Sequence, residues 1–366
     1  MPPLLKVENL RTYFYSRSKQ SFVRAVDGVS LEVGHGETVG LVGESGSGKS
    51  ISAMSMMGLL DAGPGVIGGN IHYAGSRVQK NLLEDLESFV RIKEEHGRVM
   101  EVSKDEAGWH KHSECLMQNL RGREISMIFQ NPRASLNPYI TVGEQITEAI
   151  RLHTAIKSAK EARERALYWL EQVKIDSPRL RFNSYTSAMS GGMCQRAMIA
   201  MALSSEPSLL IADEPTTGLD ATIQSKIVDL LDELKKGTGI STLLISHDIS
   251  VISRLSDRVA VMYGGAVVEY GNGKLLLDKG ETRKHPYTAA LLASVLNEQN
   301  IRDKSNLQAI EGDVLDTIKV PPGCRFHARC NRITPDVREK CATHHPDLQE
   351  VAPGHQIRCW LFATRD

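Results

Sequence analysis

Short apolar runs bounded by glycine or polar residues recur along the first three quarters of the chain. One of them, 29–43, is typical of a strand, a glycine turn and a second strand. Three more are ISMIFQ (125–130), SLLIADEP (208–215) and STLLISHD (241–248). These runs are short and almost wholly apolar, which predicts strands buried on both faces of a sheet.

Helical patterns separate these strands. Residues 143–175 are expected to be helical, with one apolar face formed by Ala162, Ala166, Leu167, Leu170 and Val173. A second helix-like run covers Met193–Leu203, and the helix in QSKIVDLLDELKKG is predicted to stop at Gly237. Residues 258–271 resemble a hairpin with a Gly-Gly turn. Strands that alternate with helices predict an α/β core with a parallel sheet.

Two regions depart from this pattern. Residues 76–120 are polar and mixed in charge, without a clear strand pattern. After about residue 275, proline, cysteine and histidine accumulate, which predicts a separate C-terminal unit.

Composition excludes several classes of protein. The chain has 366 residues, 41% of them hydrophobic, which suggests two or three globular domains. Lys plus Arg and Asp plus Glu both number 44, so nothing indicates bulk electrostatic binding to nucleic acid or to an anionic membrane surface. No apolar run is long enough to span a bilayer, and the N-terminus lacks the layout of a signal peptide. We therefore expect a cytoplasmic protein.

The stretch GESGSGKS (43–50) fits the phosphate-loop pattern G-x-x-x-x-G-K-[ST]. It follows a predicted strand and opens a predicted helix, which is the context the motif requires. Its glycines allow backbone N–H groups to close around phosphate oxygens. The predicted ATP-binding residues are Gly43, Glu44, Ser45, Gly46, Ser47, Gly48, Lys49 and Ser50. Lys49 would reach the β- and γ-phosphates, and Ser50 would hold Mg²⁺.

Polar side chains end the other predicted strands. Asp213 is placed to hold the Mg²⁺ shell, and the adjacent Glu214 to orient or deprotonate the attacking water. Gln130 would ligate Mg²⁺ or that water, and His247 ends a further strand. Taken singly, a strand-end Gln or His is more often structural than catalytic.

A second anion-binding helix start occurs in MSGGMCQRA (189–197). Ser190, Gly191 and Gly192 precede the helix, whose free N–H groups and dipole suit an anion, yet no lysine accompanies them. The sequence pattern by itself does not explain why one chain would carry two such sites.

The sequence resembles the ATP-binding subunits of ABC transporters. GESGSGKS, MIFQNP, SGGMCQR, LLIADEP, TGLD (217–220) and LLISHD occur in that family's order. The resemblance implies a P-loop ATPase domain over 1–275, with an antiparallel β subdomain and a helical subdomain at about 131–195. It also implies a dimer in which Ser190, Gly191, Gly192 and Asp220 contact the ATP held by a second ATPase subunit.

The same resemblance assigns further roles. His247 would contact the γ-phosphate, and Gln130 with the segment after it would sense a transmembrane partner. An aromatic side chain near the N-terminus would stack on adenine, and Phe14 is favoured over its rivals Tyr13 and Tyr15.

A closer resemblance is to the oligopeptide/dipeptide importer branch, which also includes nickel importers. LRGREISMIFQNPRASLNP, HPYTAALL (285–292) and PPGCRFHARC (321–330) carry it, so that it extends over a C-terminal extension, 276–366. It implies a peripheral protein on the cytoplasmic face of the membrane that drives uptake of di- or oligopeptides. The implied partners are a related ATPase chain, two permease subunits and an extracytoplasmic substrate-binding protein, with no nucleic acid.

Two departures from that branch qualify these expectations. Cys194 stands where the branch usually has arginine, and YTSAM precedes the Ser-Gly-Gly element, which leaves open a hydrolytically weak site at the partner's ATP. Residues 76–118 would be an insertion, either a solvated loop, a small helical insert or, through His110, His112 and Cys115, a metal site.

Four C-terminal cysteines are candidate metal ligands: Cys324, Cys330, Cys341 and Cys359. Their spacing lacks the short knuckles of common zinc sites, and a 4Fe-4S cluster, zinc or no metal all remain open. Related importer subunits carry a 4Fe-4S cluster on cysteines like these, and this resemblance favours the cluster.

Two other classes of ABC protein fit this sequence less well. A soluble cassette protein acting on ribosomes or DNA would usually have two cassettes or a long coiled coil, and neither is visible here. A cassette that binds ATP without hydrolysing it conflicts with the intact Lys49, Asp213, Glu214 and His247.

Overall fold

A mixed eight-stranded sheet forms the centre of the computed structural model, which describes residues 2–95, 98–278, 280, 283–294 and 310–363. Its strands lie in the order β13-β14-β12-β11-β3-β10-β9-β8. Their bounds are β3 Thr38–Val42, β8 Ile125–Ile128, β9 Leu209–Asp213, β10 Ser241–Ile245, β11 Arg258–Tyr263, β12 Ala266–Asn272, β13 Gln349–Ala352 and β14 His355–Ile357. The five strands from β11 to β8 are parallel, so their carboxyl ends meet at one edge.

The parallel strands are buried on both faces, as their apolar runs predict. Along β10, Leu243 and Ile245 belong to one hydrophobic cluster and Leu244 to the other. The period-two alternation of a strand therefore feeds two cores on opposite faces of one sheet. Five helices accompany this sheet: α1 Lys49–Met57, α9 Ala221–Thr238, α10 Ile249–Leu255, α11 Gly273–Leu277 and α12 Pro286–Ala293.

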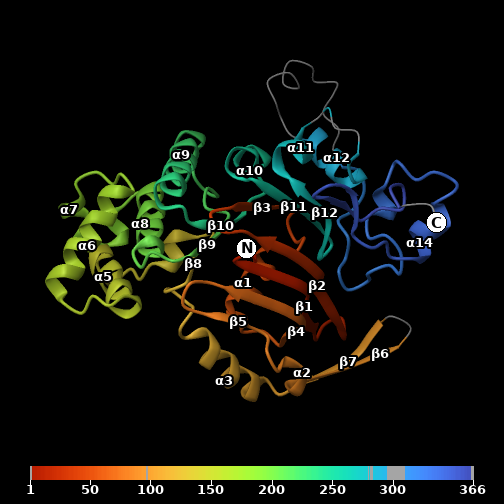
Figure 1. Cartoon of the computed structure of the whole chain (residues 1–366), viewed down its shortest axis with the longest axis horizontal. Coiled ribbons are helices and arrows are strands. Elements are labelled where there is room, and N and C mark those ends of the chain that lie inside the picture. Colours follow the sequence, from red (N-terminus) through yellow and green to blue (C-terminus); the bar gives the residue numbers. More distant parts are fainter. Residues whose placement is uncertain (1, 96–97, 279, 281–282, 295–309, 364–366) are drawn as a thin grey trace.

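An antiparallel sheet, ordered β2-β1-β4-β5, covers α1 and one face of the central sheet (Figure 1). Its strands are β1 Leu5–Ser16, β2 Ser21–Val33, β4 Pro64–Ala74 and β5 Gln79–Asn81. A helical region lies at the opposite side from the C-terminus (Figure 1). It contains α4 Pro132–Ser135, α5 Val142–His153, α6 Ala159–Gln172, α7 Pro178–Phe182, the 3-10 turn η1 Thr186–Ala188 and α8 Gly191–Leu203.

Several predicted elements have different limits in the structure. The region expected to be helical over 143–175 contains two helices, α5 and α6, and Ser158 caps the second one. Helix α9 runs through Gly237 to Thr238 and ends at Gly239, whose φ of 65° is the left-handed cap that glycine favours.

The polar segment 76–120, where no strand was expected, contains a hairpin. Strands β6 Val90–Glu95 and β7 Arg98–Lys104 stand between the short helices α2 Leu86–Phe89 and α3 Glu106–Met117. The hairpin escapes prediction because most of β6 is solvent-exposed on both faces, which removes the alternation that identifies a strand.

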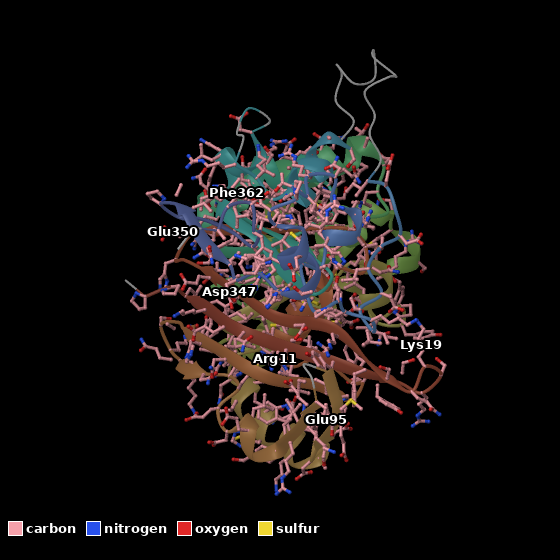
Figure 2. All side chains as sticks on the ribbon, turned by 90° about the vertical axis from the view of Figure 1, so that its right-hand side faces the viewer. Arg11, Lys19, Glu95, Asp347, Glu350 and Phe362 are labelled. Atoms are coloured by element: carbon pink, nitrogen blue, oxygen red, sulfur yellow. The ribbon has the colours of Figure 1, made fainter. Side chains whose placement is uncertain are left out.

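The C-terminal unit continues the central sheet, because β14 pairs with β12 and β13 pairs with β14. Figure 2 views this end of the molecule, with Glu350 and Asp347 of the C-terminal unit above the antiparallel sheet that carries Arg11. The 3-10 turn η3 His327–Arg329 and helix α14 Arg338–Thr343 complete the unit. The composition change near residue 275 therefore marks no break in the sheet.

Candidate functional site

The phosphate loop lies between β3 and α1, at the carboxyl edge of the parallel strands. Gly48 precedes α1 with a φ of 100°, and a Cβ there would collide with the carbonyl oxygen of Ala25. Gly43 is equally constrained, since a Cβ would collide with the Met262 carbonyl. Only glycine fits these two positions, so the turn that gathers the loop's N–H groups depends on them.

Lys49 is buried within the loop. Its Nζ donates to the carbonyls of Gly43 at 2.8 Å and Glu44 at 3.0 Å. Burial lowers the pKa of Lys49, while the carboxylates of Glu214 and Asp213 oppose that shift. The ammonium group is thus held beside the space that the loop encloses.

Asp213 and Ser50 meet as the sequence predicts. Ser50 Oγ donates to Asp213 Oδ1 at 3.0 Å, which joins the start of α1 to the end of β9. Burial raises the pKa of Asp213 against that hydrogen bond. Two adjacent oxygen atoms at this edge are the donor chemistry that Mg²⁺ prefers, with phosphates and water completing its shell.

Glu214 is the centre of a polar cluster. Its Oε2 accepts from Gln130 Nε2 at 2.9 Å and from Thr217 Oγ1 at 2.8 Å, and lies 3.2 Å from His247 Nδ1. Burial acts to raise the pKa of Glu214, but the hydrogen bonds from Thr217 and His247 outweigh it and hold the pKa below its usual value. The structure therefore brings Gln130, Glu214 and His247 together from the ends of three strands.

Thr217 is a member of this cluster that the sequence analysis did not name. It lies in TGLD, three positions after Glu214, and its own N–H also donates to the Glu214 carbonyl at 3.1 Å. Glu214 has a φ of 47°, and the turn through Thr217 sustains this uncommon conformation.

The Ser-Gly-Gly element forms the exposed start of α8. Ser190 caps the helix by accepting from the Met193 N–H at 3.3 Å. Gly191 and Gly192 lie against Leu219 and Ile223, so this start is beside Asp220, the cap of α9. Among the described residues, no hydrogen bond joins Ser190, Gly191 or Gly192 to the chain's own phosphate loop.

Cys194 is fully buried beneath this surface, with Sγ 3.7 Å from the Thr186 carbonyl oxygen. Burial raises the pKa of its thiol. The position that departs from the importer branch thus packs inside the helical region, whereas Ser190 and Asp220 are exposed.

The three candidate aromatic residues occupy different environments along β1. Tyr13 is buried, and its hydroxyl donates to Asp27 Oδ1 at 2.6 Å. Tyr15 is exposed and packs edge-on against Phe22, and Phe14 is half-buried. Tyr13 is therefore committed to the fold, which leaves Phe14 and Tyr15 as candidates for stacking.

The four C-terminal cysteines line one small cavity, together with His285, Phe326 and other apolar residues. Burial raises the pKa of Cys324 to about 11, with Cys341 and Cys330 adding to the shift, and raises the pKa of Cys359 to about 12. In the described part of the chain, no three His, Cys, Asp or Glu side chains are placed to hold a single metal ion. This also holds for His110, His112 and Cys115. The His112 ring lies near the rings of Phe89 and Trp109, and Cys115 is exposed.

The fold and the strand-end cluster together define a phosphate-loop ATPase. The family model of the ABC transporter matches residues 26–217, and that of the oligopeptide/dipeptide transporter C-terminal region matches residues 268–341. The chain belongs to the ABC transporter family, as the motif order indicates.

Relatives and solved structures agree with this assignment. The chain is 42% identical to the oligopeptide transport ATP-binding protein AppD of Bacillus subtilis, over 99% of this chain and 98% of AppD. It is 38% identical to the dipeptide transport ATP-binding protein DppD of Escherichia coli, over 97% and 96% respectively. Among solved structures, the dimeric ABC transporter cassette MJ0796 matches with a TM-score of 0.57 and 25% identity, covering 74% of this chain and 99% of that one. A cbiO1 subunit from Clostridium perfringens matches with a TM-score of 0.55 at 25% identity, over 77% and 93%.

None of the helices in the described part of the chain is both long enough and apolar enough to cross a bilayer.

Proposed function

We propose that this ATPase drives the uptake of di- or oligopeptides through a membrane importer. The observation that carries the proposal is the cluster of Gln130, Glu214 and His247 beside Ser50, Asp213 and Lys49. The peptide substrate rests on the names of the similar proteins AppD and DppD, and the relatives give no comparable support to nickel.

In the proposed reaction, Glu214 acts as the general base. Its lowered pKa keeps it ionised at neutral pH, and Gln130 and His247 hold its Oε2 atom. Water placed against that oxygen would lose its proton to Glu214 as it attacks the γ-phosphate. Lys49 binds the β- and γ-phosphates, His247 contacts the γ-phosphate, and Phe14 stacks on adenine.

Mg²⁺ is the implied metal of this site. Ser50, Asp213 and Gln130 would hold it, and the ion would neutralise phosphate charge. The Ser50–Asp213 hydrogen bond already places the two oxygen ligands side by side.

The exposed starts of α8 and α9 complete the site of a second ATPase subunit. Ser190, Gly191, Gly192 and Asp220 would face the γ-phosphate bound by that subunit, which explains a helix start with free N–H groups and no lysine. We infer that the second subunit is a related but different chain. The remaining partners are two permease subunits and an extracytoplasmic substrate-binding protein, so that this chain is peripheral on the cytoplasmic face of the membrane.

We also infer that Cys324, Cys330, Cys341 and Cys359 hold a 4Fe-4S cluster. All four line one cavity, and a cluster offers a separate iron atom to each thiolate, so the ligands need not converge on a single ion. The cluster would act as a structural staple for a unit with little apolar core of its own.

Iron and acid-labile sulfide in anaerobically purified protein test this cofactor, with a Cys359→Ser variant for comparison. Iron and sulfide in equal amounts, lost in the variant, are expected. Zinc without sulfide would indicate a zinc site in place of the cluster. Background levels of every metal would indicate four cysteines that bind no metal.

Uptake of labelled di- and oligopeptides by cells that lack this chain tests the transport function. We expect uptake to fail and to return with the intact chain but not with Lys49→Ala. Unchanged peptide uptake would remove peptides as the cargo, and nickel uptake would then be measured in the same cells.

A further inference from the structure

Glu44, the second residue of the phosphate loop, is held by the C-terminal unit through a set of contacts that the roles above do not use. Its carboxylate accepts two hydrogen bonds from Arg329, at 2.8 Å from Nη1 to Oε2 and at 3.1 Å from Nη2 to Oε1. Its backbone N–H donates to the Tyr287 hydroxyl at 2.8 Å. Its carbonyl is the group that receives Lys49 Nζ. Every polar group of Glu44 is therefore bonded, two of the three to residues more than 240 positions away.

Arg329 is built into this position. Its side chain is 6% exposed, and its remaining donors reach the carbonyls of Glu311 and Ile310 and the Tyr263 hydroxyl. A fork of guanidinium donors matched to both carboxylate oxygens fixes the orientation of Glu44 as well as its charge. Tyr287 is fully buried, and its ring packs 4.7 Å from that of Tyr263 and 5.4 Å from that of Phe326.

The negative charge of Glu44 explains why its pairing with Arg329 would matter for ATP binding. A carboxylate within a loop that must enclose a triphosphate repels its ligand, because like charges at short range disfavour one another. A paired arginine cancels that repulsion and prevents the carboxylate from turning toward the phosphates. In this chain, the arginine of the C-terminal unit neutralises the negative residue at this position.

We propose that Arg329 and Tyr287 are positioning residues of the phosphate loop, which hold and neutralise Glu44 and so make ATP affinity depend on the docked C-terminal unit. The proposal rests on ATP binding at residues 43–50. It concerns the affinity for nucleotide and places neither residue in the chemical step.

The test is a double-mutant cycle on the full-length protein, read out as the Kd of a fluorescent ATP analogue and as kcat and KM for ATP hydrolysis. Arg329→Met leaves Glu44 charged and unpaired, and we expect Kd and KM to rise about tenfold while kcat changes less than about twofold. Glu44→Gln alone removes the carboxylate that repels the phosphates, so we expect its Kd for ATP to fall below the wild-type value, and a rise in Kd would count against the charge argument.

The decisive variant combines Arg329→Met with Glu44→Gln. If the pair acts through charge, removing the carboxylate restores most of the lost affinity in the double variant. A loss of the same size in the single and double variants overturns the proposal, because it would come from packing around Arg329 rather than from Glu44.

Tyr287→Phe tests the hydrogen bond between the Glu44 N–H and the Tyr287 hydroxyl, since only that hydroxyl is removed. We expect a smaller rise in Kd, about threefold. No change in Kd would mean that Tyr287 is not a positioning residue of the phosphate loop. If Arg329→Met does not fold, Tyr287→Phe and Glu44→Gln still test the contact. Arg338→Met is the matched control, because Arg338 is an exposed arginine of α14 in the same unit.

The proposal and the function it rests on fail differently. A wild-type protein that binds no ATP would overturn the assignment of residues 43–50. If the wild-type protein binds ATP and Arg329→Met binds it with the same Kd, only the positioning role of Arg329 and Tyr287 would be overturned.

Discussion

Two glycine-rich helix starts occur in this chain, and they differ in how completely the chain itself surrounds them. The start of α1 is enclosed, with Lys49 buried inside the loop, Asp213 bonded to Ser50, and Glu44 held by Arg329 and Tyr287. The start of α8 is exposed, and among the described residues the Ser190 side chain bonds to the Met193 N–H of its own first turn, while its carbonyl accepts from the Cys194 N–H.

The difference shows that a helix start alone does not define a phosphate site. Both starts offer free N–H groups and a positive dipole end. In the described part of the chain, the buried Lys49 and the carboxylates of Asp213 and Glu214 gather around the first start, whereas the hydrogen bond of the Ser190 side chain at the second is made within its own first turn. Close to the second start, Arg133 donates to the Met189 carbonyl at 3.0 Å, so that this arginine is bonded to the backbone. A site of that kind requires a second surface that brings the phosphate with it.

The largest effect is expected at the base. Glu214→Gln keeps a side chain of nearly the same shape but removes the proton acceptor, so ATP hydrolysis should fall about a thousandfold while ATP binding remains. Phosphate release and analogue binding would be measured on the same preparation. In Glu233→Gln, a matched change at an exposed glutamate of α9, hydrolysis should stay normal. Turnover at the wild-type rate in Glu214→Gln would exclude Glu214 as the base.

The next effect concerns ATP binding at the enclosed start. Lys49→Ala removes the ammonium group that the loop holds, so Kd for ATP should rise about a hundredfold through the loss of charge-assisted hydrogen bonds. Titration with a fluorescent analogue measures it. The thermal stability of the variant without nucleotide serves as the control for folding. A Kd within a few fold of the wild type would contradict the assignment of this loop.

The third prediction separates the two starts. Gly191→Asp places a carboxylate at the exposed start, where a Cβ has room because its nearest neighbour, a Leu219 methyl group, would lie 3.6 Å away. If the α8 start serves the other subunit, as proposed, ATP binding by the isolated chain should be unchanged. Hydrolysis by the assembled transporter should fall about tenfold from repulsion of the γ-phosphate.

Gly191→Ala is the matched control for this variant, because it adds the Cβ without the charge. A loss of ATP binding in the isolated Gly191→Asp chain would mean that the α8 start contributes to the chain's own site.

Much of the enclosed site can be predicted from sequence because its parts are local. The phosphate loop is eight consecutive residues, and the apolar strands that end in Gln130, Asp213 and His247 are short continuous runs. Parallel strands bring their carboxyl ends to one edge, so the order of motifs predicts which side chains meet. The α/β class and the Gly-Gly hairpin are confirmed for the same reason.

The parts that escaped prediction depend on residues far apart or on exposed surface. Glu44 and Arg329 are 285 positions apart, and no periodicity in either segment marks their contact. Strand β14 joins the central sheet through only two paired positions, which gives almost no hydrophobic pattern. Most of strand β6 is exposed on both faces, where burial no longer distinguishes inside from outside.

The smallest effect is expected at Cys194, and it completes the comparison between the two starts. The thiol lies beneath the exposed Ser-Gly-Gly surface and faces the core, where Ala212 of β9 belongs to the same cluster. Cys194→Ala should therefore lower the free energy of unfolding by about 1 kcal/mol, because one buried sulfur atom is lost from a packed site. Hydrolysis by the assembled transporter should change less than about twofold, since the start of α8 keeps Ser190, both glycines and their N–H groups. Denaturant unfolding and phosphate release measure the two quantities. If Cys194→Ala lowered hydrolysis as much as Gly191→Asp while stability changed little, the buried Cys194 would have to act on the partner's ATP site. The buried face of α8 and its exposed Ser-Gly-Gly start would then not have separate roles.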